Sequence, residues 1–96
     1  MKRISRSEEP ILTSALEAYG GTMQQMVLLE EMSELQKEIC KQWRGRDNLK
    51  QIAEEMADVQ IMLDQMTLYF QNGGLQEQFR MEKLARLGER LGLIPN

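Results

Sequence analysis

A short acidic phrase occurs twice in the chain and constrains its fold more than any other feature. The first copy, EEMSEL, occupies residues 30–35, and the second, EEMADV, occupies residues 54–59. Each copy fits an α-helix, because apolar residues recur beside the acids at helical spacing. The segment between them, Arg44 to Asn48, has the composition of a loop. This pattern predicts two helices that pair antiparallel across a connection at Gly45.

The acids keep the same offset from an apolar stripe in both helices. At about 100° per residue, Glu31 and Glu34 lie to one side of the first stripe, and Glu55 and Asp58 lie to the same side of the second. If the helices pair antiparallel, Glu34 and Asp58 fall at about the same height, and four carboxylates share one half-buried patch. The residues of the two stripes are Leu28, Met32, Leu35 and Ile39, and Ile52, Met56, Val59 and Leu63.

Carboxylates packed in this way repel one another, and partial burial adds a desolvation cost. A hard divalent cation removes both costs, and Mg²⁺ or Mn²⁺ prefers oxygen ligands. We therefore predict a metal site made by Glu31, Glu34, Glu55 and Asp58. The alternative interpretation is a solvated acidic helix face, which is common on surface helices.

The whole chain excludes several classes of protein. Its 96 residues predict one domain over 1–96, with residues 1–6 frayed and residues 93–96 as a tail. The net charge of −3 and the scattered basic residues argue against a nucleic-acid polymer as partner. There is no histidine, which excludes a His-based triad and most zinc sites. The single Cys40, the lack of an apolar leader and the lack of a membrane-spanning run predict a cytoplasmic location.

The pattern predicts four helices, over residues 7–19, 22–43, 48–70 and 75–91, and no strand. Ser7 is the expected N-cap of the first helix, and Asn48 with Gln51 is the expected capping box of the third. The segment Asn72-Gly73-Gly74 is expected to form the turn before the fourth helix. The fold class predicted is all-α.

Two of these helices need cover beyond the central pair. The third helix is apolar over more than one stripe, so it must be buried on two sides, either by the fourth helix or by a second subunit. A core this small also favours oligomerisation. The apolar face expected to point inward from the fourth helix consists of Phe79, Leu84, Leu87 and Leu91.

The paired motif Glu-Glu-x-x-Glu and Glu-x-x-Asp resembles the signature of the MazG-like, all-α nucleoside triphosphate pyrophosphohydrolases. It is carried by Glu30, Glu31, Glu34, Glu55 and Asp58. The resemblance extends over about residues 11–91 and is strongest to the short, single-domain proteins of phages and their bacterial hosts. The tail MEKLARL at residues 81–87 is also similar to that subgroup.

The resemblance implies a four-helix MazG-like bundle completed by assembly into a homodimer or homotetramer. It implies cleavage of a (d)NTP between the α and β phosphates, giving the monophosphate and pyrophosphate. Glu31, Glu34, Glu55 and Asp58 would then be the Mg²⁺ ligands, and Glu30, which points about 100° away from Glu31, would have a supporting or purely structural role.

Such a reaction also needs a proton acceptor and cations for the phosphates. With no histidine, the acceptor candidates are Glu34 and Glu38. The first candidates for phosphate binding are Lys83 and Arg86, which share a face of the fourth helix and are expected to reach across a subunit boundary. Arg44 and Arg46 in the loop are alternatives, and all four are equally compatible with a solvated surface.

Two further residues are candidates for binding the nucleoside. Trp43 is the only tryptophan, and its ring is suited to stacking on a base or to packing at a helix end. Gln24 lies one heptad before Glu31, where it would read a base edge or sit at a wet helix end. Two other functions compete with the enzyme: a non-catalytic helical interaction module, and a metal-dependent nucleotide binder without turnover.

Overall fold

Four α-helices and no strand make up residues 4–95, the part of the chain that the computed structural model describes. The prediction of an all-α fold is therefore confirmed. Each helix begins and ends within two residues of its predicted bounds. The helices are α1 (Glu9–Tyr19), α2 (Gly21–Trp43), α3 (Leu49–Phe70) and α4 (Gly73–Arg90). None of them is long and apolar enough to cross a membrane.

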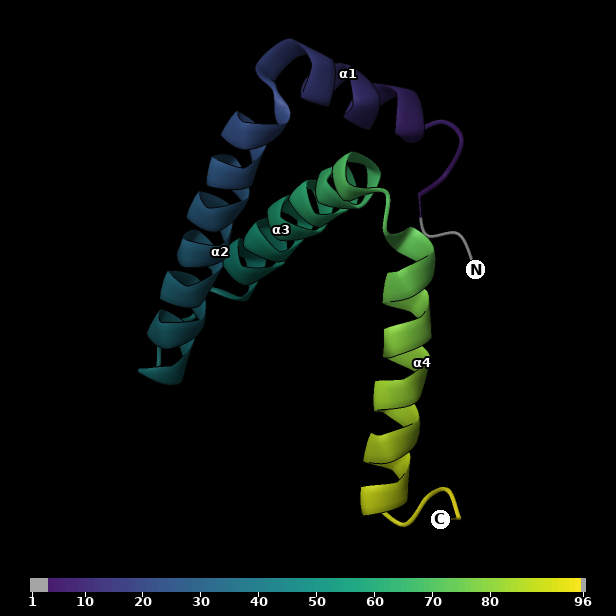
Figure 1. The fold of residues 1–96 in the computed structure, drawn as a ribbon. Coiled ribbons are helices and arrows are strands. Elements are labelled where there is room, and N and C mark those ends of the chain that lie inside the picture. The colour runs from purple at the N-terminus through teal and green to yellow at the C-terminus, as the bar shows by residue number, and fades with distance from the viewer. Residues whose placement is uncertain (1–3, 96) are drawn as a thin grey trace.

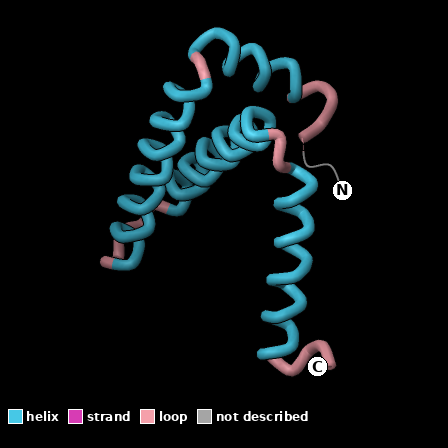
Figure 2. The backbone as a smooth tube through the Cα atoms, viewed as in Figure 1, coloured by secondary structure: helices cyan, strands magenta, loops and turns pink. Residues whose placement is uncertain are grey.

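Helices α2 and α3 form an antiparallel pair that is the centre of the fold (Figure 1). Helix α1 crosses the end of this pair and packs on both members, whereas α4 packs along none of the other three helices. Figure 2 shows the short loops at each reversal of the chain. Because α4 extends away, the radius of gyration is 16.3 Å, compared with about 12.5 Å for a compact domain of this length.

A small core lies where α1 meets the pair. The buried apolar side chains are Ile4, Leu12, Met62 and Met66. Near them the start of α2 approaches α3 so closely that a Cβ at Gly21 would overlap the ring of Tyr69. The absence of a side chain at Gly21 is therefore what allows the ring to pack against the N-terminus of α2.

The face that α2 turns toward α3 is more polar than the sequence predicts. Met32 and Met56, which belong to the predicted stripes, are 40% and 48% exposed. Glu31 and Glu55 are half-buried between the helices, as predicted for the acid patch, and so are four other residues of the stripes, Leu28, Leu35, Ile52 and Val59. Both helices carry apolar residues over more than one stripe, so the pattern is compatible with more than one rotation about the helix axis. A second apolar surface is left open, including Met32, Ile39, Met56, Ile61 and Leu63.

The expectation that the fourth helix buries its apolar face is wrong for a single chain. Phe79, Leu84 and Leu87 are 49%, 51% and 43% exposed, and Leu91 is also exposed. The apolar spacing correctly predicts an amphipathic helix, but α4 leaves the α2–α3 pair and its face finds no cover within one chain.

Several turn and cap predictions are also wrong. Gly73 and Gly74 belong to the first turn of α4, and the chain reverses instead at Gln71, whose φ of 52° is left-handed. The N-cap of α1 is Glu8 rather than Ser7, and its N–H donates to the Ser5 side chain. Asn48 is the N-cap of α3 but makes no side-chain capping bond, because its amide reaches across to α2.

Residues near both ends of the described chain pack against the helices. The predicted fraying of residues 1–6 falls in part on residues 1–3, which lie outside the described residues, as does residue 96, but Ile4 is buried. At the other end, the N–H groups of Leu93 and Ile94 donate to the Gly88 carbonyl, and the Ile94 side chain closes on Gly88. The tail therefore folds back on the last turn of α4.

Candidate metal centre

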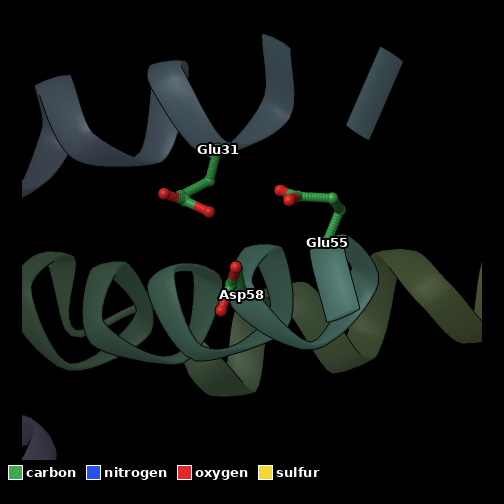
Figure 3. A group of neighbouring side chains, drawn as sticks. All are labelled: Glu31, Glu55 and Asp58. Atoms are coloured by element: carbon green, nitrogen blue, oxygen red, sulfur yellow. The ribbon is translucent and has the colours of Figure 1, made fainter. Parts of the chain in front are cut away.

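Three of the four predicted ligands converge between α2 and α3. Glu31 extends from α2 toward Glu55 and Asp58 on α3, as Figure 3 shows. One carboxylate oxygen from each residue lies within 4.8 Å of the others. Glu55 and Asp58 are three residues apart and so share one face of α3. The antiparallel pairing then brings Glu31 to their height, whereas the sequence pattern predicts Glu34 at the height of Asp58.

Burial and neighbouring acids destabilise the charged forms of Glu31 and Glu55. The pKa of Glu31 is raised above its ordinary value of 4.5, first by burial, then by a hydrogen bond with Asp58, and then by the charges of Asp58, Glu55 and Glu34. The pKa of Glu55 is raised as well, first by burial and then by the charges of Asp58, Glu34, Glu38 and Glu54. A positively charged ligand between Glu31, Glu55 and Asp58 would therefore be stabilised by these carboxylates.

The donor set fits a hard divalent cation. Its ligand atoms are all carboxylate oxygens, which Mg²⁺ and Mn²⁺ prefer. The Oε2 atom of Glu55 is buried without a hydrogen-bond partner, which is a costly state that a cation would relieve. Oxygens on an octahedral Mg²⁺ are about 3 Å apart when adjacent and about 4.2 Å apart when opposite. One oxygen from each of the three residues lies within 4.8 Å of the others, so the group is close to the spacing that one ion requires.

Glu34, the fourth predicted ligand, lies beside this group but not within it. Its charge contributes to the raised pKa of both Glu31 and Glu55, so its carboxylate is near them. Its Oε1 lies 3.4 Å from Nζ of Lys37, and the Glu34 side chain is 49% exposed. Glu34 is thus positioned to turn toward the three acids if its bond to Lys37 is released.

Glu38 is held in a different way. The side-chain amide of Asn48 donates to Oε1 of Glu38 at 2.8 Å and to its carbonyl oxygen at 2.9 Å, and Lys41 donates to Oε2 at 3.0 Å. The hydrogen bond from Asn48 is the main cause that lowers the pKa of Glu38, followed by that from Lys41. Both oxygens are engaged, so Glu38 is a weak proton acceptor.

Gln24 is buried at the other end of the helix pair. Its Nε2 donates to Oε1 of Gln65 at 2.7 Å, and Nε2 of Gln65 in turn lies 3.8 Å from the sulfur of Met62. The amide of Gln24 is therefore directed toward α3, not toward solvent. Sequence reasoning missed Gln65, although Gln65 follows Asp58 by the same seven residues that separate Gln24 from Glu31.

The other predicted substrate-binding residues do not meet the three acids within one chain. Trp43 is 87% exposed at the end of α2, about 18 Å along the axis from Glu31. Arg44 and Arg46 lie exposed in the adjoining loop. Lys83 and Arg86 line a large open groove between α4 and the C-terminal half of α3, a groove that none of the three acids lines.

The hollow beside Glu31 and Asp58 is small. It measures about 160 Å³ and is lined otherwise by Val27, Ile61 and Met62. Pockets that enclose a small-molecule ligand are usually about 300–1,000 Å³. The hollow beside Glu31 and Asp58 is therefore too small to enclose a nucleotide within one chain.

No protein-family model, curated protein or solved structure matches the chain. Functional inference therefore depends on the residues and their geometry.

We predict that Glu31→Gln stabilises the metal-free protein at neutral pH. Because the pKa of Glu31 is raised in the folded state, the protonated carboxyl stabilises the fold fully below about pH 4.5. This stabilisation is lost as the pH rises through the pKa that Glu31 has in the folded protein. Glutamine stays neutral, so the Tm difference between variant and wild type should be small near pH 4 and should grow to several degrees at pH 7.

The measurement is thermal unfolding from pH 4 to 8 with and without Mg²⁺, with Glu30→Gln as the matched control. Mg²⁺ should raise the Tm of wild type and of Glu30→Gln, and should have little effect on Glu31→Gln. A Tm difference that does not change with pH would contradict the electrostatic account of Glu31.

Proposed function

We propose that this protein is a Mg²⁺-dependent nucleoside triphosphate pyrophosphohydrolase that cleaves (d)NTP to (d)NMP and pyrophosphate. The observation that supports this most is the convergence of Glu31, Glu55 and Asp58 from two antiparallel helices. Three carboxylates leave coordination positions open, and Mg²⁺ commonly joins a few carboxylates to substrate phosphates. The order of the acids resembles the MazG-like motif, and this resemblance implies cleavage of the bond between the α and β phosphates.

In this proposal Glu31, Glu55 and Asp58 hold Mg²⁺, with Mn²⁺ as a substitute, and Glu34 joins them. When bound, the ion supplies the charge that admits a polyphosphate to an acidic surface and lowers the pKa of a water. Glu34 is the better of the two candidates for proton acceptor, because both oxygens of Glu38 are engaged and its pKa is lowered.

We further propose that the site is completed by assembly into a homodimer or homotetramer. One chain leaves apolar faces open on α2, α3 and α4, and its hollow at the acids is smaller than a nucleotide pocket. Exposed apolar surface on this scale is typical of subunit interfaces. A second copy would cover these faces and would bring Lys83 and Arg86 of its own α4 near the phosphates.

If the protein assembles through α4, a substitution that disrupts the apolar face of α4 should lower its mass in solution. Wild type should sediment at two or four times the 11.2 kDa of one chain. Leu87→Glu should shift it toward the monomer, because the charge falls at the centre of the exposed apolar face. Gln78→Glu, on the opposite side of α4, is the matched control and should leave the assembly intact. A monomeric wild type at micromolar concentration would contradict this part of the proposal.

A product assay tests the activity itself. The protein is incubated with a panel of NTPs and dNTPs plus Mg²⁺, and products are separated by ion exchange. We expect monophosphate and pyrophosphate, abolished by EDTA and reduced at least about 100-fold in Glu55→Gln. Glu54→Gln, with the adjacent acid neutralised, should retain activity.

The other outcomes separate the competing functions. Diphosphate and phosphate as products would place the cleaved bond elsewhere in the triphosphate. Nucleotide binding that needs Mg²⁺, without turnover, would indicate a nucleotide binder. Neither turnover nor binding would leave a helical interaction module and would contradict the proposal.

A further inference from the structure

Two lysines accompany the acids along α2, each paired with the glutamate three residues before it. Nζ of Lys37 lies 3.4 Å from Oε1 of Glu34, and Nζ of Lys41 lies 3.0 Å from Oε2 of Glu38. The two lysines are four residues apart, so they follow the same face of the helix. In the described part of the chain, Glu34 and Glu38 lie beside the three converging acids, and Lys37 and Lys41 are the lysines paired with them.

The two pairs differ in how firmly the glutamate is held. The Glu38 side chain is only 14% exposed and is fixed from α3 by the amide of Asn48. The Glu34 side chain is 49% exposed and has Lys37, itself 63% exposed, as its hydrogen-bond partner. An exposed pair of this kind contributes little to stability and exchanges readily. Lys41 is therefore held in place, whereas Lys37 can change partner.

The position of Glu34 links that exchange to the metal centre. Glu34 follows Glu31 by three residues on α2, so the two side chains are neighbours on the helix surface and Glu34 is near the place where a cation would be held. A divalent cation held by the three acids would keep open coordination positions, and a carboxylate oxygen of Glu34, one helical turn away, can fill one of them. Lys37 would then lose its partner beside the bound ion.

We propose that Lys37 binds the substrate's phosphates, exchanging the Glu34 carboxylate for a phosphate oxygen when Glu34 turns to the metal. This inference rests on the proposed function. The flexible four-carbon stem of lysine suits such a movement, and an ammonium is a common phosphate ligand. The phosphate chain would then extend from the three acids along α2 toward the α2–α3 loop. This direction follows from Lys37 lying C-terminal to Glu34 on that helix.

The test measures binding by calorimetry with two probes, Mg²⁺ alone and inorganic tripolyphosphate in the presence of Mg²⁺. For Lys37→Met, which keeps much of the stem but removes the charge, tripolyphosphate binding should weaken about tenfold or more. Mg²⁺ alone should bind equally well or more tightly, because Lys37 no longer competes for Glu34. Lys37→Arg should restore most of the tripolyphosphate affinity.

Lys41→Gln is the matched control, since it removes the same charge one turn further along the helix. It should change tripolyphosphate affinity less than twofold. With an active enzyme, Lys37→Met should raise KM for the triphosphate about tenfold and change kcat less.

Each contrary result has a separate meaning. A wild type that binds Mg²⁺ and tripolyphosphate, with Lys37→Met unchanged, overturns the role of Lys37 and leaves the proposed function standing. An equal loss of tripolyphosphate affinity in Lys37→Met and Lys41→Gln would mean that only the overall positive charge of α2 matters, and would also overturn the role of Lys37. A wild type that binds neither probe contradicts the proposed function together with this inference.

Discussion

Mutual repulsion among Glu31, Glu55 and Asp58 is the constraint around which the α2–α3 pair is built. Burial first, and then the charges of the neighbouring acids, raise the pKa of Glu31 and Glu55, and one oxygen of Glu55 is buried without a hydrogen-bond partner. The pair tolerates this arrangement because other contacts fix its register. One heptad before Glu31 on α2, Gln24 bonds to Gln65, and one heptad after it, Glu38 bonds to Asn48.

These two flanking contacts explain why the acids meet at one height. Each is a side-chain hydrogen bond between α2 and α3, and each is buried or partly buried, so a shift of one helix along the other would leave polar groups unpaired. The apolar contacts between the helices are not directional and would permit such a shift. The polar bonds therefore supply specificity, and the acids occupy the layer between them.

The same rotation of the helices determines where the apolar surface lies. With Glu31 and Glu55 on the packed face, Met32 and Met56 turn outward, and α4 keeps its own apolar face open. The chain therefore presents acids between α2 and α3, and separate apolar faces that no part of the described chain covers. Ile61, which belongs to the open apolar surface, also lines the hollow beside Glu31 and Asp58, so the proposed assembly and the proposed metal site adjoin there.

Much of this arrangement could be predicted from sequence. The helical spacing and the glycines gave bounds close to those of α1 to α4. The repeated acidic phrase predicted that acids of the two helices would meet, but it placed Glu34 at the height of Asp58, where the structure places Glu31. The rotation of α2 and α3 could not be predicted, because each helix has more than one apolar stripe.

The remaining errors have a common physical cause. Asn48 has the right residue type for a capping box, but its amide donates to Glu38 on the neighbouring helix. The apolar face of α4 indicates that another surface covers it, but the sequence does not indicate whether that surface belongs to the same chain or to a second copy. Local patterns specify local structure, whereas these outcomes depend on contacts between elements.

The most direct test of the central claim is anomalous diffraction from crystals grown with Mn²⁺. The account predicts one strong peak between α2 and α3, with carboxylate oxygens of Glu31, Glu55 and Asp58 at about 2.1 Å and Glu34 turned toward the ion. A fully Mn²⁺-equilibrated crystal with no peak there, or with ions only elsewhere on the surface, would contradict it.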